Sequence, residues 1–283
     1  MKVAVIGDCK SRCFGNVAAA LTQSDVLTLY IGPFGEADRV SKHFASIEDR
    51  DLIFCTHLEE HDKNLLERSV SGRVFYWHAF NFIGLHPDII SLKRSNPLGE
   101  YHSAIAVAFF LSGSTVSEAF SAYNALTYGR LGYFDLYEAG RKYWIEAGRQ
   151  QNMQYDFAAA FERWGRRGNF MHSVNHPHST VTVDIAQDAA IRAGLEVDSS
   201  LADIIPDDFT SGQICPVYPE IAHRRDFDGS YYWKARDDFG GTVYNHWNFL
   251  QACFDSYADA SREELLANER IATTMNALGL GAK

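Results

Sequence analysis

The chain has 283 residues, a formal net charge of −10, 46% hydrophobic residues and 22% charged residues. This length suffices for one large domain, or for one domain with a helical extension, and the composition is typical of a globular protein. A protein that binds nucleic acid over a broad surface is expected to be basic, so the acidic total argues against that class. Local basic clusters still leave an anionic ligand open.

The cysteines and the apolar runs predict a reduced, cytoplasmic protein without a membrane span. The five cysteines are at positions 9, 13, 55, 215 and 253. Their number is odd, and the first pair has the spacing Cys-x3-Cys, which is typical neither of zinc sites nor of thioredoxin-like motifs. We therefore expect reduced thiols and no metal. No run approaches the ~20 apolar residues of a membrane span, and the apolar run after Met1 and Lys2 is too short for an export signal.

The first part of the chain alternates between short apolar runs and helical patterns. The predicted strands are residues 2–6, 26–31, 51–56 and 73–77, and the predicted helices are 11–22, 36–46 and 58–69. This alternation predicts parallel strands joined by right-handed crossovers, in an open doubly wound sheet. Such sheets bind ligands beyond the carboxyl ends of their strands. Four residues that follow predicted strand ends are expected at that rim: Cys9, Gly32, His57 and His78.

The pattern becomes mainly helical after about residue 99. The predicted helices are 101–111, 116–125, 135–151, 155–164, 179–194, 244–257 and 261–278. Residues 166–173 fit a late strand or a loop. Ser179 or Thr180 is the expected N-cap of its helix, and Ser261 with Glu264 forms a capping box. The predicted fold is α/β: an open parallel sheet with flanking helices in residues 1–98, and a mainly helical part in residues 99–283 that completes the same domain.

Residues 3–9, Val-Ala-Val-Ile-Gly-Asp-Cys, carry the first candidate for chemistry. They read as a buried strand, a turn at Gly7 and then Cys9 at the start of a helix, flanked by Lys10 and Arg12. A thiol at a helix start among cations is expected to have a lowered pKa and to act as a nucleophile. The structural alternative is that Cys9 is a small buried residue beside a strand.

The same helix start is a candidate phosphate site. Amide groups, the helix dipole and two cations suit an anion. The residues predicted to bind it are Lys10, Ser11, Arg12, Gly15 and Asn16. Neither a dinucleotide-binding fingerprint nor a Walker motif is present, and a solvated basic turn is the structural alternative.

A histidine beside a proline, in the segment 175–180 (Asn-His-Pro-His-Ser-Thr), is the candidate base. Histidine is the usual partner of a cysteine or serine nucleophile, and the segment stands just before a long predicted helix. His176 is the predicted base, and Asn175 would orient its ring or contact substrate. The alternatives are that His176 only stacks and that Asn175 forms an Asx turn.

Two further segments provide candidate polar contacts. In residues 81–88, His86 could contact substrate or assist acid–base chemistry. Asp88 could pair with His86 or contact substrate, and the alternative for Asp88 is a turn cap. His102, at the start of an apolar helical pattern, would either line the cleft for substrate or be a core histidine. No His, Cys, Asp and Glu set has the spacing of a metal site.

Two basic clusters follow later in the chain. Arg163, Arg166 and Arg167 form the first, and His223, Arg224 and Arg225 form the second. The first could meet phosphates, although such clusters more often form a solvated face, and the second is equally ambiguous.

Taken together, five segments resemble the WcbI family, the acetyltransferases of capsular polysaccharide biosynthesis. They are residues 6–10 (Ile-Gly-Asp-Cys-Lys), 84–88 (Gly-Leu-His-Pro-Asp), 101–103 (Tyr-His-Ser), 174–177 (Val-Asn-His-Pro) and 216–219 (Pro-Val-Tyr-Pro). They stand in the family's order over roughly residues 1–260. The family more usually has Asn and Gln where this chain has Asp8 and Lys10. The first segment is also similar to the Gly-Asp-Ser block of SGNH hydrolases, with Cys in place of Ser, but their Asp-x-x-His is not matched, because Ser173 stands three residues before His176.

The resemblance implies an α/β protein that binds coenzyme A and transfers an acetyl group from acetyl-coenzyme A to a carbohydrate. Two mechanisms fit this activity. Cys9 takes the acetyl group as a thioester and passes it to a sugar hydroxyl, with His176 as base, or His176 activates the hydroxyl directly and Cys9 only shapes the site. His86 is the reserve base. The rival functions are an SGNH-like esterase with water as acceptor, and a coenzyme A- or nucleotide-binding module without turnover.

Overall fold

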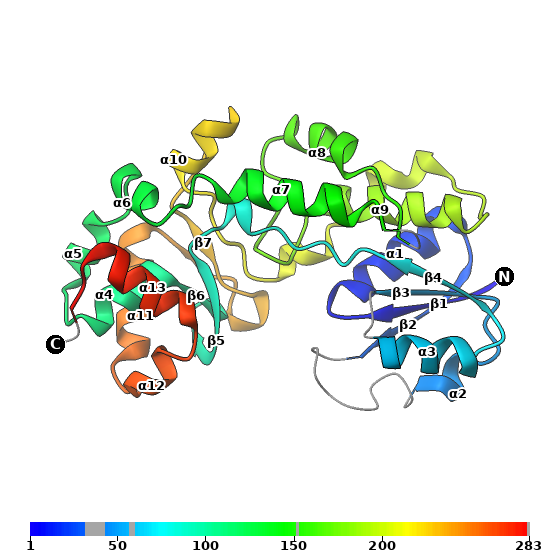
Figure 1. The fold of residues 1–283 in the computed structure, drawn as a ribbon, viewed down its shortest axis with the longest axis horizontal. Helices are drawn as coiled ribbons and strands as arrows, with labels where there is room; N and C mark the ends of the chain where they lie inside the picture. The colour runs from blue at the N-terminus through cyan, green and yellow to red at the C-terminus, as the bar shows by residue number, and fades with distance from the viewer. Residues whose placement is uncertain (32–42, 57–59, 151–152, 282–283) are drawn as a thin grey trace. The chain divides into compact units, whose positions relative to one another are not determined.

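The computed structural model describes residues 1–31, 43–56, 60–150 and 153–281, and they form two compact units (Figure 1). Unit 1 consists of residues 1–80, 144–161 and 177–208, and unit 2 of residues 81–143, 162–176 and 209–283. The sequence-based halves, 1–98 and 99–283, therefore both contribute to each unit. Gly32, His57 and most of the predicted helix 36–46 lie outside the described residues.

Unit 1 contains a four-stranded parallel sheet, as the alternating pattern predicts. Its strand order is β2-β1-β3-β4. The strands are β1 (Lys2–Gly7), β2 (Asp25–Tyr30), β3 (Leu52–Thr56) and β4 (Arg73–Trp77). β1 is an interior strand with β2 on one side and β3 on the other, and Val3 is in register with Val26 and with Leu52. The α/β fold class is confirmed.

Helices cover both faces of this sheet (Figure 1). On one face lie α1 (Lys10–Thr22) and α9 (Ser179–Arg192), and on the other lie α2 (Phe44–Ile47) and α3 (Glu60–Ser69). On the first face Phe14 of α1 packs against Phe54, with ring centroids 5.6 Å apart, and stacks on Trp77 at 4.2 Å. On the second face Ile47 and Leu66 join the buried residues of the strands. Both faces of the sheet are therefore apolar, as a covered parallel sheet requires.

α1 and α9 pack together and run in the same direction. Near their starts, the Thr182 side chain hydrogen-bonds the Cys13 thiol. At the other end, the amide of Asp198, which follows α9, donates to the carbonyl of Leu21 in the last turn of α1 at 2.8 Å. The α1 helix leaves the carboxyl end of β1 and returns to the start of β2. Both helices therefore begin at the carboxyl edge of the sheet.

Unit 2 is mainly helical, with two short antiparallel pairs, β5 with β6 and β7 with β8. Its strands are β5 (Ile89–Asn96), β6 (Gly99–Ser103), β7 (Trp233–Lys234) and β8 (Val243–Tyr244). Its helices are α4 (Ala104–Leu111), α5 (Val116–Ser121), α6 (Ala125–Arg130), α10 (Pro219–Ala222), α11 (His246–Tyr257), α12 (Arg262–Leu265) and α13 (Glu269–Leu278). Two helices, α7 (Leu136–Ala147) and α8 (Phe157–Gly165), carry residues of both units. The 3₁₀ turns are η2 (Ile83–Leu85), η3 (Ser199–Ile204), η4 (Asp208–Ser211), η5 (His223–Arg225) and η6 (Asp237–Phe239).

Some of the predicted helices are divided by N-cap residues that the apolar periodicity of the sequence did not reveal. The predicted helix 101–111 begins only at residue 104, because residues 101–103 pair with β5 and Ser103 caps α4 by accepting from the Ala106 amide. Asn124 is the N-cap of α6 and lies within the predicted helix 116–125, of which α5 forms only the first part. Asn268 starts α13 and interrupts the predicted helix 261–278. The capping box of Ser261 and Glu264 is confirmed, and residues 166–173 form no helix and no extended strand.

Two absences hold for the described part of the chain. No helix there is both long and apolar enough to cross a bilayer. The same residues contain no group of three or more His, Cys, Asp or Glu side chains placed to hold a metal ion.

The contact between α1 and β2 gives a prediction for Gly15. A Cβ at Gly15 would lie 2.1 Å from Oγ1 of Thr28 and 3.3 Å from its Cβ. We expect Gly15→Ala to lower the free energy of unfolding by about 1–3 kcal/mol, as overpacking does. Thr28→Ala removes the clashing oxygen, so the double variant should recover most of that loss in urea unfolding. Additive losses in the two single variants would contradict this packing account.

Candidate functional site

Cys9 lies at the point where the sheet order reverses. The chain passes from β1 to β2 on one side and then crosses back to β3 on the other, so the carboxyl ends of β1 and β3 flank the crevice where open α/β sheets bind ligands. Gly7 makes the close approach possible, because a Cβ there would lie 2.7 Å from Cγ2 of Thr56 on β3. Cys9 is exposed, whereas the other four cysteines are buried. It is therefore the accessible thiol of the chain.

The residues on either side of Cys9 form an ion pair. Lys10 Nζ lies 2.5 Å from Asp8 Oδ2, and both side chains are largely buried. Asp8 also accepts from the Lys10 amide through Oδ1, at 2.9 Å, so its carboxylate caps the start of α1. The residues that flank Cys9 are thus coupled, as a carboxylate and an ammonium in contact.

The pKa of the Cys9 thiol is raised, and the predicted lowering is wrong. Removal of water from around the sulfur is the largest cause, because it disfavours the thiolate. Lys10 lowers the pKa, but Asp8 raises it, and the backbone amides of Cys9 and Lys10 lower it again by smaller amounts. The sequence suggested a cation beside the thiol, whereas the structure pairs that cation with a carboxylate. Cys9 is therefore mostly protonated near neutral pH and needs a base to react.

The residues predicted to bind phosphate point in different directions. Ser11 is buried with its hydroxyl on the Leu29 carbonyl, and Gly15 packs against β2. Arg12 is exposed, and the exposed Asn16 donates to Asp208 Oδ2 at 2.8 Å. With Lys10 buried in its pair with Asp8, Arg12 is the cation of this set that faces solvent.

Two consecutive carboxylates, which the sequence analysis missed, join α1 and α9 near their starts. Asp208 binds Asn16 of α1, and Asp207 Oδ2 accepts from the Ser179 amide at 2.9 Å. The N-cap position of α9 is His178, not Ser179 or Thr180, and its side chain makes no capping bond, so Asp207 caps this helix instead. These contacts join residues far apart in the chain, so no local sequence pattern marks them.

In unit 2, His176 is held by two aromatic rings. It stacks on Phe209 with ring centroids 4.6 Å apart and planes 13° apart, and it meets the edge of Tyr101 at 6.1 Å. Its carbonyl accepts from the His172 amide at 2.7 Å, which closes a tight turn. Asn175 accepts hydrogen bonds from the hydroxyls of Tyr101 and Ser173. The His176 ring is therefore packed against Phe209 and Tyr101, and no sequence pattern marks Phe209.

His86 and Asp88 are interior residues of unit 2. His86 is 2% exposed, with its Nδ1 and Nε2 on the carbonyls of Pro216 and Met171 at 3.1 and 3.2 Å. Asp88 is 1% exposed and accepts from the hydroxyls of Tyr133 and Tyr218 and from the first turn of α4. The two do not form the His–Asp pair considered from the sequence; each binds other groups. Their contacts connect the segments 84–88 and 216–219.

Of the two alternatives considered for His102, the structure supports a core histidine. It is 0% exposed, with Nδ1 near the Tyr257 hydroxyl at 3.0 Å and Nε2 on the Arg94 carbonyl at 2.7 Å. Burial is the largest cause that lowers the pKa of His102, to about 4, and burial likewise lowers the pKa of His86 to about 4. Both rings are therefore neutral in the folded protein at neutral pH.

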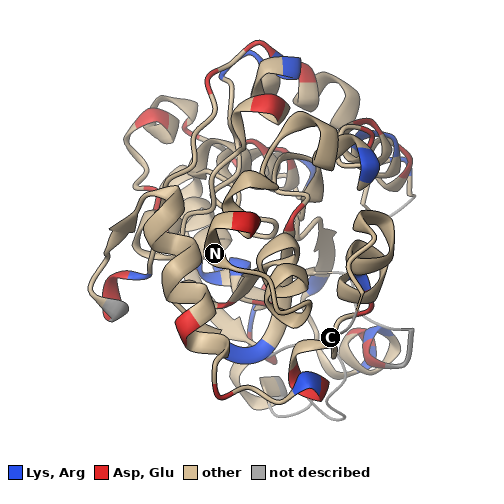
Figure 2. Cartoon of the chain, turned by 90° about the vertical axis from the view of Figure 1, so that its left-hand side faces the viewer, with Lys and Arg blue, Asp and Glu red and all other residues tan. Residues whose placement is uncertain are grey.

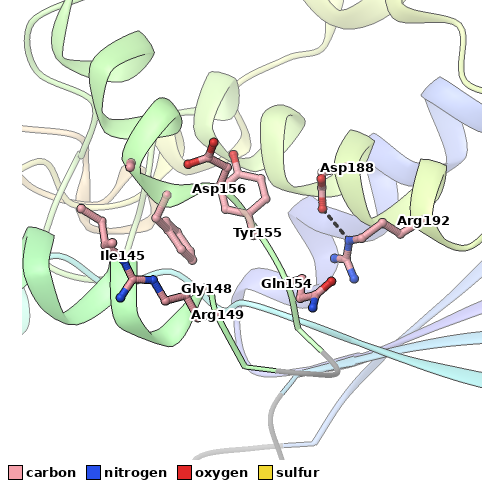
Figure 3. Close-up of a pocket in the computed structure, with 10 residues that line it drawn as sticks. Ile145, Gly148, Arg149, Gln154, Tyr155, Asp156, Asp188 and Arg192 are labelled. Carbon is pink, nitrogen blue, oxygen red and sulfur yellow. Dashed lines mark hydrogen bonds and ion pairs between the residues drawn. The ribbon is translucent and has the colours of Figure 1, made fainter.

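A hollow of about 520 Å³ in unit 1 lies away from Cys9 (Figure 3). It is lined by the end of α7, the segment 154–158 and the end of α9, where Arg192 Nε binds Asp188 Oδ2 at 2.7 Å. Because α9 begins at the carboxyl edge of the sheet, this hollow is at the opposite end of that helix from His178.

The chain belongs to the WcbI family of polysaccharide biosynthesis enzymes, whose family model matches residues 2–198. This range includes Cys9, His86, His102 and His176. No curated protein and no solved structure matches the chain. The family resemblance read from the sequence is thus confirmed, and with it the general role in polysaccharide biosynthesis.

The exposure and raised pKa of Cys9 give a prediction for its alkylation. Under limiting iodoacetamide, peptide mapping should show Cys9 labelled first, because the other four thiols are buried and burial raises their pKa values, that of Cys13 to about 12. The labelling rate should keep rising above pH 8.5, the ordinary midpoint for cysteine. Earlier labelling of Cys215 or Cys253, or a midpoint well below 8, would contradict this assignment.

The buried histidines predict acid lability. Their folded pKa values of about 4 lie below the unfolded value of about 6.5, so the unfolded chain binds protons first as the pH falls. The contribution of each buried histidine to the free energy of unfolding is therefore fully present above about pH 6.5. It is lost progressively towards pH 4, by up to about 3 kcal/mol for one histidine. Urea unfolding at several pH values should show a shallower loss for His102→Gln than for the wild type. The exposed His223→Gln is the matched control, and equal slopes for all three proteins would refute the assignment.

Proposed function

We propose that the protein transfers an acetyl group from acetyl-coenzyme A to a hydroxyl group of a carbohydrate, with Cys9 as the covalent carrier. The observation that carries the proposal is the position of Cys9. It is the exposed thiol of the chain, at the carboxyl end of an interior strand beside the reversal of strand order. Membership of a polysaccharide biosynthesis family supports a carbohydrate, such as a capsule precursor, as the acceptor.

The chemistry proceeds in two acyl transfers. A base takes the proton of Cys9, the thiolate attacks the thioester carbonyl, and coenzyme A leaves as a thiolate that recovers the proton. The base then takes the proton of a sugar hydroxyl, whose oxygen attacks the carbonyl on Cys9. The bond to Cys9 breaks, and its sulfur takes the proton back. The first transfer exchanges one thioester for another and is nearly isoenergetic, so it needs no further energy source.

A base is required because the raised pKa keeps Cys9 protonated. We assign this role to His176. Its loop immediately precedes α9 in the chain, and histidine is the usual partner of a cysteine nucleophile. The stacking of His176 on Phe209 and the contacts of Asn175 restrict the ring to one orientation. His86, the reserve candidate, has both ring nitrogens on backbone carbonyls and is given a structural role here.

The start of α1 is proposed to receive the phosphates of coenzyme A. The exposed Arg12 supplies the positive charge there, whereas Lys10 neutralises Asp8, whose carboxylate already accepts from the Lys10 amide. Asp88 and His102, predicted from the sequence to contact substrate, are fully buried and shape unit 2 from within. Asn175, beside the base, remains the candidate contact for the acceptor.

Substitution of the two histidines of one loop tests the base. We expect His176→Gln to lower kcat by about 10²–10⁴-fold, the usual range for loss of a general base, with little change in the affinity for coenzyme A. His178→Gln is the matched control in the same loop and should lower kcat by less than about tenfold. The assay follows coenzyme A release and acetyl transfer to a panel of sugars.

Three outcomes would overturn the proposal. A larger loss in His178→Gln than in His176→Gln would move the base to His178. Acetyl release to water from simple esters without coenzyme A would favour an esterase. Tight coenzyme A binding that is unaffected by Cys9→Ala, with no turnover, would favour a binding module.

A further inference from the structure

The two basic clusters of the sequence converge in unit 2. Arg225 Nη1 donates to Glu138 Oε1 of α7 at 2.8 Å, and Arg141 of the same helix binds Glu162 of α8 at 3.3 Å. The segment after α8 meets the segment after η5, where a Cβ at Gly168 would lie 3.4 Å from Phe227. Residues 163–167 and 223–225 are therefore brought together along α7.

Two of these arginines are fixed on aromatic rings. The Arg224 guanidinium lies 3.8 Å from the ring centroid of Phe134, and the Arg225 guanidinium lies 3.9 Å from that of Tyr137. Stacking of this kind restrains a guanidinium while its N–H groups remain directed outward in the ring plane. The cations are thus partly organised before any ligand binds.

This surface, which we call the basic face, contrasts with the charge of the whole chain. Its arginines are Arg141, Arg163, Arg166, Arg167, Arg224 and Arg225. The same segments contribute Lys142 and the carboxylates of Glu138, Glu146, Glu162, Asp226 and Asp228, with Glu162 paired to Arg141 and Glu138 to Arg225. Seven cations against five carboxylates leave an excess of two positive charges, whereas the chain as a whole has a net charge of −10. In the view of Figure 2, acidic and basic residues are interspersed along the ribbon. A local positive excess on an acidic protein attracts anions selectively at this place.

We propose that the basic face binds an anionic polysaccharide chain, the acceptor of the proposed acyl transfer. Planar guanidinium groups match carboxylate and sulfate groups in a bidentate manner. Their distribution over α7, the end of α8 and η5 suits a polymer with repeated charges rather than one phosphate group. The acidic total disfavours nucleic acid, and membership of a polysaccharide biosynthesis family favours a glycan.

Charge reversal tests the basic face. Arg166→Glu/Arg167→Glu reverses two exposed arginines of the face, and Arg68→Glu/Lys93→Glu reverses two exposed cations outside it, with the same change in net charge. The probes are polygalacturonate, neutral dextran and coenzyme A, in calorimetric titrations at low and high salt. We expect the wild type to bind polygalacturonate, more weakly at high salt, and not dextran. The first variant should lose about tenfold or more in affinity, and the control less than threefold.

The inference rests on the proposed function only for the identity of the acceptor. The experiment therefore distinguishes failure of the polysaccharide site from failure of the proposed acetyl transfer. Equal losses in both variants, or none in the first, would overturn the basic face whatever the enzyme does. A loss of coenzyme A binding in the first variant, without loss of polygalacturonate binding, would make the face a donor site. If the basic face behaves as expected but the wild type transfers no acetyl group, the proposed function fails and the polysaccharide site stands.

Discussion

The position of β1 between β2 and β3 is the constraint on which the rest of unit 1 depends. Because the chain departs to one side of β1 and returns on the other, the carboxyl ends of β1 and β3 are not bridged by the first crossover, α1. Gly7 lets the two strands end in contact, and any larger residue would meet Thr56. The next residues must then start α1 at that edge. Cys9 is exposed there for a topological reason, before any chemistry of its own is considered.

The Cys9 thiol is exposed to solvent, and its raised pKa keeps it protonated near neutral pH. Asp8 opposes the effect of Lys10 on the Cys9 thiol, and its carboxylate also caps the helix. A protonated thiol reacts slowly near neutral pH, so Cys9 depends on a base for fast reaction. Asp207 caps the start of α9, and Asp208 accepts from Asn16 of α1, so both helices of unit 1 are held near their starts.

Sequence patterns predicted the features that depend on residues close together in the chain. The strands of the sheet follow from apolar runs, and the capping box at Ser261 follows from its spacing. The same reasoning placed Tyr101 and His102 in a helix, because it could not anticipate their pairing with β5. It also predicted a lowered pKa for Cys9, because neither the desolvation of the sulfur nor the pairing of Lys10 with Asp8 can be read from the local sequence. Contacts such as His176 with Phe209, or Asp207 with Ser179, join distant residues and leave no pattern in the chain.

The most direct test of the account is the mass of the protein after brief incubation with acetyl-coenzyme A in the absence of an acceptor. The account predicts the addition of one acetyl group, mapped to the peptide that contains Cys9, and its loss when an acceptor sugar is added. Cys9→Ser should not accumulate an adduct that a sugar discharges at a comparable rate. Unmodified wild-type protein that still transfers acetyl groups, or full activity in Cys9→Ala, would contradict a covalent role for Cys9.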